Sequence, residues 1–236
     1  EGENSKADIL FLADAGALYS SQLKELFTKL DQKRFNFVPK SLRNDYWVGI
    51  TKRARILFYN PNVLSLNEIK DITYENLAEK KWEKAIAIRQ SNNIYNQSLV
   101  ASILEHNGEK KTEKWLNGLV KNFARSPQGN DRAQILMVAA GKAKLAVANS
   151  YYYSLMLSGI KGDKQKKAAE KVLPIFPNQE GRGAHINISG GGVAKYSKNK
   201  KEAVALLEFL SKAQSQKMYG EINFEYPVNP SVETTE

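Results

Sequence analysis

The 236-residue chain has no cysteine and only two histidines. The absence of cysteine excludes disulfide scaffolds, thiolate zinc sites, iron–sulfur clusters and cysteine nucleophiles. Two histidines leave little room for a histidine-rich metal site. The chain has no run of about 18 apolar residues, so we expect no membrane-spanning helix. It also lacks the Gly-x-Ser-x-Gly, His-Glu-x-x-His and paired-carboxylate motifs of hydrolases, which disfavours that class of enzyme.

Basic residues outnumber acidic ones: 35 Lys and Arg against 25 Asp and Glu give a formal net charge of +10. Such a charge is found in proteins that bind nucleic acids or anionic surfaces. The lysines are spread along the chain, however, and no basic-region, zinc-finger or ribonucleoprotein motif is present. We therefore interpret them as solvated helix faces and expect no nucleic-acid partner.

Short apolar runs alternate with segments of helical periodicity. We expect strands at residues 7–12, 45–50, 53–59, 85–89, 144–148 and 172–176, and helices at 17–30, 98–107, 109–122, 132–140 and 200–214. This alternation predicts an α/β chain with largely parallel sheets. The triple glycine at 190–192 is not followed by Gly-Lys-Ser/Thr, so it indicates a strand bend or hinge rather than a phosphate-binding loop.

Tyrosine is the most abundant aromatic residue, with 11 copies against nine Phe and three Trp. Tyr151, Tyr152 and Tyr153 follow the predicted strand at 144–148, and Tyr95 follows another predicted strand by way of a polar loop. The carboxyl ends of strands are where α/β proteins bind ligands. This shared position favours a binding site over the alternative, in which the phenols simply pack with their hydroxyls in water.

Several phenols near one another suit a strongly charged cation. A phenol has a pKa of about 10, so a phenolate at neutral pH needs such a cation beside it. Ferric iron matches anionic oxygen, and a sugar stacked on the rings is the competing interpretation. Arg53 and Arg55 lie two positions apart in a predicted strand and therefore face the same side. One of them can hold an anion that completes the coordination shell of a metal; the alternative is an exposed strand face.

Six stretches of the sequence, covering nearly the whole chain, match one known family in order. They are residues 1–16, 47–60 and 91–102, Gly-Asn-Asp at 129–131, Ala-Asn-Ser-Tyr-Tyr at 148–152 and Tyr-Pro-Val-Asn-Pro at 226–230. In these stretches the chain resembles the periplasmic ferric-iron-binding proteins of ABC transporters. The resemblance implies that Tyr95, Tyr151 and Tyr152 are ligands of ferric iron, Fe(III), and that Tyr153 is not. It also implies that Arg53 or Arg55 binds a synergistic anion such as carbonate.

The resemblance implies the two-lobed type II periplasmic binding protein fold, an α/β fold with hinge crossover strands. We expect crossovers near 55–59 and 186–192, with the triple glycine as part of the hinge. The first lobe would comprise 1–54 and 190–225, and the second 55–189 with 226–236 as its tail. The implied function is not enzymatic: a monomer in the periplasm captures ferric iron in the interlobe cleft and delivers it to an inner-membrane ABC permease. The alternative to a periplasmic location is an extracytoplasmic protein held to the membrane by a lipid anchor.

The chain departs from the family pattern at several positions. It begins after the first strand and loop, which carry a Tyr or a His-Tyr pair in relatives, and it stops before the final helices. We therefore expect a chain truncated at both ends. Ala13 stands where some relatives have Glu, and Leu155 where some have Arg. Three alternatives stay open: a type II binding protein for another solute such as thiamine or a phosphonate, a hydrolase that uses the cleft, and a basic nucleic-acid-binding module.

Overall fold

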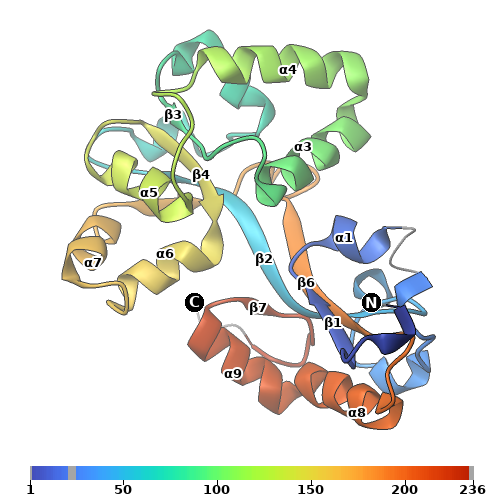
Figure 1. Ribbon diagram of the computed structural model, residues 1–236. Coiled ribbons are helices and arrows are strands. Elements are labelled where there is room, and N and C mark those ends of the chain that lie inside the picture. Colours follow the sequence, from blue (N-terminus) through green and yellow to red (C-terminus); the bar gives the residue numbers. More distant parts are fainter. Residues whose placement is uncertain (1, 21–24, 234–236) are drawn as a thin grey trace. The chain divides into compact units, whose positions relative to one another are not determined.

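The computed structural model describes residues 2–20 and 25–233. The chain divides into two compact units, Glu1–Arg53 with Asn187–Glu236 (unit 1) and Ala54–Ile186 (unit 2). It enters unit 2 within strand β2 (Val48–Tyr59) and returns to unit 1 at the start of strand β6 (Ile186–Val193), as can be followed in Figure 1. Within the described ranges, no helix is long and apolar enough to cross a membrane.

Unit 1 is built on an antiparallel sheet. Strand β6 pairs with β1 (Ile9–Leu12), and the first half of β2 pairs with the short strand β7 (Tyr226–Pro227). Among the described residues, its α-helices include α1 (Ala15–Tyr19), α8 (Lys200–Ser211) and α9 (Ala213–Asn223). The predicted helix at 17–30 includes positions 21–24, which lie outside the described residues. The core of the unit buries apolar side chains of β2, β6 and α8 against one another, among them Val48, Ile50, Val193 and Leu207.

The end of the chain belongs to unit 1, and the prediction that 226–236 forms a tail of the second lobe is wrong. Strand β7 pairs with Thr51 and Lys52 in the first half of β2. Val228, which follows β7, is fully buried in the core of unit 1. A two-residue strand is too short for its sequence to indicate which strand it pairs with. The pairing of β7 is set instead by the burial of Val228 in the apolar core of unit 1.

Unit 2 surrounds the second half of β2 with three further strands and five helices among the described residues. The strands are β3 (Ile86–Ala87), β4 (Leu145–Asn149) and β5 (Leu173–Ile175). The helices are α3 (Ile94–Asn107), α4 (Glu109–Lys121), α5 (Asp131–Ala139), α6 (Ser150–Leu157) and α7 (Asp163–Ala169). The core packs the apolar faces of β2, β3 and β4 against α3 and α4, with Leu57, Ile86, Leu145, Ile103 and Trp115 among its residues.

The strands are mostly antiparallel, so the prediction of largely parallel sheets is wrong. β4 and β5 both run antiparallel to β2, whereas β3 and β4 are parallel. A strand–helix alternation indicates parallel pairing only where successive strands of the alternation are neighbours. Here the long strand β2 lies between β6 and β4 in the sheet order, and both come much later in the sequence. Its pairing with β4 is antiparallel.

The triple glycine lies inside β6, where close packing accounts for it. A Cβ atom at Gly192 would lie 2.5 Å from the carbonyl oxygen of Tyr46 and 2.6 Å from the Phe27 ring. One at Gly190 would lie 2.7 Å from the carbonyl oxygen of Val48. The chain passes between the units at 186/187, before the first of these glycines. The glycines thus let backbones approach within unit 1, and a hinge is not needed to explain them.

Replacing Gly192 by Ala should destabilise unit 1 by roughly 1–3 kcal/mol or more, because the added methyl group meets a backbone oxygen that cannot move aside. Gly191→Ala is the matched control. Its Cβ would lie 3.0 Å from Leu207 Cδ2 and 3.1 Å from the Phe11 ring, which are side-chain atoms that can shift. Urea unfolding of both variants measures the difference. Equal losses of stability at the two positions would contradict the packing explanation.

Candidate functional site

Tyr95, Tyr151 and Tyr152 all lie in the first turns of helices in unit 2. Tyr95 is the second residue of α3, whose N-cap Asn93 accepts a hydrogen bond from the Tyr95 N–H at 3.0 Å. Tyr151 and Tyr152 are the second and third residues of α6, which begins directly after β4. The N-terminus of a helix carries a partial positive charge that stabilises anions. Both helices therefore present phenols at the end that favours a phenolate.

The structure brings the three predicted ligands together. The hydroxyl oxygens of Tyr95 and Tyr151 are 3.4 Å apart, and the ring centroids of Tyr151 and Tyr152 are 4.2 Å apart. All three side chains are half-buried, so each stays accessible on one side. Tyr153 does something else: its hydroxyl donates to the carbonyl of Val172 at 2.7 Å, and its ring packs on Phe58. Only three of the four clustered phenols are thus placed for a shared ligand.

Tyr151 and Tyr152 resist ionisation as they stand. Burial raises the pKa of Tyr151 well above its ordinary value, and the neighbouring phenols Tyr152 and Tyr95 raise it further. Burial also raises the pKa of Tyr152, with repulsion from a Tyr95 phenolate and from Asp131 acting in the same direction. A trivalent cation among the three oxygens would reverse this balance, since it stabilises every phenolate at once. In the described part of the chain, no group of three or more His, Asp or Glu side chains offers another metal site.

Arg55, one of the two arginines expected to bind an anion, lies buried in unit 2 with its terminal nitrogens already hydrogen-bonded. Its guanidinium donates to Asp131 and Asn149, each at 3.0 Å, and to Asn96 at 2.6 Å. The side chain is only 2% exposed, so the alternative of an exposed strand face is wrong for it. A bound anion would have to compete with these internal acceptors.

Arg53, the other candidate, lies in unit 1 and is equally buried. Its guanidinium donates to Ser189 Oγ at 2.8 Å and to the carbonyl oxygen of Ala13, and it lies 3.9 Å from the Glu225 carboxylate. An exposed strand face is wrong here as well. A charged side chain in a strand does not reveal whether it faces water or a buried partner, and both arginines of β2 have buried partners.

Two charged residues near the phenols, Arg89 and Asp131, were not predicted from the sequence to be site residues. The Arg89 guanidinium lies 5.4 Å from the centre of the Tyr95 ring, close enough for a cation–π interaction. Arg89 also pairs with the fully buried Asp131 at 3.4 Å. Asp131 stands in the Gly-Asn-Asp stretch that carried the family resemblance, which was the one available signal. Nothing in the residue order links Arg89 to the tyrosines.

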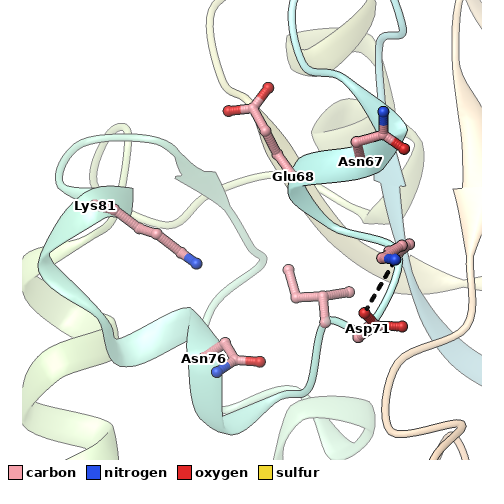
Figure 2. Close-up of a pocket in the computed structure, with 7 residues that line it drawn as sticks. Asn67, Glu68, Asp71, Asn76 and Lys81 are labelled. Carbon is pink, nitrogen blue, oxygen red and sulfur yellow. Dashed lines mark ion pairs between the residues drawn. The ribbon is translucent and has the colours of Figure 1, made fainter.

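A second feature of unit 2 is a hollow of about 180 Å³ that no tyrosine lines. Figure 2 shows its labelled lining residues, Asn67, Glu68, Asp71, Asn76 and Lys81; Lys70 and Ile72 complete it. Lys70 and Asp71 form an ion pair at 3.9 Å, and Lys81 pairs with Glu79 at 3.0 Å. The lining has two basic side chains, Lys70 and Lys81, and two acidic ones, Glu68 and Asp71, and both ion pairs are mostly exposed, so the hollow shows no strong charge of one sign.

The three phenols thus converge at the N-termini of two helices of an α/β chain, an arrangement that can hold a ligand. A family model described as "bacterial extracellular solute-binding protein" matches residues 4–236. The chain belongs to this family.

Named relatives share this similarity over almost the whole chain. "Iron uptake protein A1" of Synechocystis sp. is 44% identical over 231 residues, which are 97% of this chain and 63% of that protein. The chain thus spans less than two thirds of that relative's length. The "Major ferric iron-binding protein" of Neisseria meningitidis is 28% identical over 242 residues and is covered to 70%.

Solved structures confirm the predicted fold class, an α/β fold of the type II periplasmic binding protein class. A Trichodesmium protein described as IdiA or FutA in complex with iron and citrate matches with a TM-score of 0.93 at 44% identity; 100% of this chain and 74% of that chain are covered. The ferric binding protein of Campylobacter jejuni matches with a TM-score of 0.92 at 37% identity, covering 100% and 75%. The resemblance to ferric-iron-binding proteins seen in the sequence is confirmed.

The buried position of Arg55 predicts a large cost for its removal. Arg55→Met should lower the free energy of unfolding by roughly 3–5 kcal/mol, because the buried Asp131 carboxylate loses its main partner. Lys81→Met is the matched control. Lys81 pairs with Glu79 at the same 3.0 Å distance, but in an exposed ion pair, and its loss should cost about 0.5 kcal/mol or less. Urea unfolding tests both; similar losses would show that Arg55 is not a structural ion-pair partner.

Proposed function

We propose that the chain binds ferric iron through the phenolate oxygens of Tyr95, Tyr151 and Tyr152. The observation that carries the proposal is the convergence of these three phenols from the N-termini of α3 and α6. The ferric-iron-binding proteins and the iron-bound structure among its relatives support the choice of metal. The protein would act without catalysis, as an extracytoplasmic monomer that delivers iron to an ABC permease.

The chemistry of the cluster supports iron(III) over a softer or less charged ion. Three phenolates carry three negative charges, which balance the charge of the ferric ion, and their oxygens are hard donors. The N-termini of α3 and α6 lower the cost of ionising the phenols as the cation binds. An anion such as carbonate would fill coordination positions that the three phenols leave open. Arg89 is the cationic side chain that contacts the phenol cluster.

Titration with ferric citrate should produce a visible charge-transfer band from tyrosinate to iron in the wild-type protein. The Tyr151→Phe, Tyr152→Phe double variant should bind iron at least about a hundredfold more weakly and show a weaker, shifted band, since only the Tyr95 phenolate is left as a ligand. Tyr153→Phe is the control and should keep the band, because that hydroxyl bonds to Val172. An unchanged band and an unchanged affinity in the double variant would exclude Tyr151 and Tyr152 as ligands. A colourless wild-type protein would favour an organic solute instead.

Iron binding should release protons and strengthen as pH rises. The pKa values of Tyr151 and Tyr152 are raised, so both phenols are protonated at neutral pH and must lose their protons to bind the metal. Below those pKa values, the affinity should increase about tenfold per pH unit for each phenol that ionises. An indicator dye in weak buffer counts the protons released on loading. Loading without proton release would contradict phenolate ligation.

A further inference from the structure

The carboxylate of Asp131, close enough to raise the pKa of Tyr152, is contacted by several chain segments. It is fully buried at the start of α5. It accepts hydrogen bonds from Arg55 at 3.0 Å, from Arg89 at 3.4 Å and from the backbone N–H of Asn149 at 2.8 Å. Asn149 is the last residue of β4 and is followed at once by the helix that carries Tyr151 and Tyr152. One side of the phenol cluster is thus anchored directly to this carboxylate.

The other side of the cluster is anchored through Asn96, the neighbour of Tyr95. Arg55, held by Asp131, donates to Asn96 Oδ1 at 2.6 Å. Asn96 Nδ2 in turn donates to the carbonyl oxygens of Arg89 at 2.7 Å and Gln90 at 3.1 Å. The start of α3 is therefore tied to β2 and to the segment that carries Arg89. A continuous chain of hydrogen bonds joins the beginnings of the two helices that carry the phenols.

We propose that Asp131, acting through Arg55 and Asn96, is a positioning residue that sets the separation of Tyr95 from Tyr151. The proposal rests on the proposed function for its consequence in iron binding. A buried carboxylate must keep its charged partners, because losing one leaves an uncompensated charge in a low-dielectric environment. The network therefore has few alternative geometries. Because the helices that carry the phenols are part of it, the positions of the phenols are restricted as well. Half-buried tyrosines packed only on apolar neighbours would have no comparable constraint on their hydroxyl oxygens.

A pair of matched asparagine variants separates positioning from general stability. Asn96→Ala breaks the connection to α3 while leaving the Arg55–Asp131 pair in place. Asn122→Ala is the control: Asn122 is also buried in unit 2, and its Nδ2 also donates to two backbone carbonyls, those of Leu77 and Glu79. Asp131→Asn is a third variant that keeps the side-chain shape and removes the charge. Urea unfolding of each variant gives its stability.

The environments of the three phenols are measured first without iron, by ¹⁹F NMR of protein labelled with 3-fluorotyrosine. Each resonance is assigned by a Tyr→Phe substitution. Asn96→Ala should shift the Tyr95 and Tyr151 resonances, whereas Asn122→Ala should leave them in place at a similar loss of stability. If Asp131→Asn folds, it should also shift the Tyr152 resonance. Unchanged Tyr95 and Tyr151 resonances in Asn96→Ala, or equal shifts in Asn122→Ala, would overturn the proposal.

The effect of each substitution on iron binding is measured by titrating the same proteins with ferric citrate. Asn96→Ala should weaken iron binding about tenfold and move the maximum of the tyrosinate band, as losses of outer-shell hydrogen bonds commonly do. Asn122→Ala should alter neither. An unchanged affinity and band in Asn96→Ala would overturn the role in iron binding. If the wild-type protein gives no band at all, the iron-binding function fails, and the fluorine shifts alone still decide whether Asp131 positions the phenols.

Discussion

The burial of the Asp131 carboxylate constrains several segments of unit 2 at once. Asp131 has no exposed surface, so its charge must be balanced by partners within the fold. Those partners come from β2, from the segment after β3 and from the end of β4, which are brought to the start of α5. If any of these segments moved, a buried charge would lose its partner. The same constraint that organises the unit also places the beginnings of α3 and α6.

Strand β2 shows why burial, rather than residue type, decides the role of a charged side chain. Its sequence includes Lys52, Arg53 and Arg55, which suggests a face in water, yet both arginines are buried. Arg53 has partners within unit 1 and Arg55 within unit 2. Each arginine thus forms hydrogen bonds within its own unit. Arginine tolerates such sites because its planar guanidinium offers several donors in fixed directions.

Local patterns in the sequence predicted the elements that position the phenols. Strands near 85–89 and 144–148 and a helix near 98–107 were expected from apolar periodicity, and they correspond to β3, β4 and α3. The observed α3 begins earlier, at Ile94, because the Asn93 side chain caps it, and this start places Tyr95 on a helix. Strand direction and the partner of β7 were not predictable, since both depend on contacts between distant segments. Their position after predicted strands singled out four of the eleven tyrosines, and the family resemblance separated Tyr95, Tyr151 and Tyr152 from Tyr153.

The net charge of +10 also acquires a physical meaning once it is divided between the units. Unit 2 has 20 Lys and Arg and 12 Asp and Glu, so 20 − 12 = +8, which is most of the total. At long range such a charge repels a free trivalent cation and attracts an anionic complex. The pKa values of Tyr151 and Tyr152 are raised, so these two phenols add no negative charge before loading. For the proposed ferric cargo, approach as an anionic chelate is therefore favoured, and Tyr151 and Tyr152 become anionic only as the metal replaces their protons.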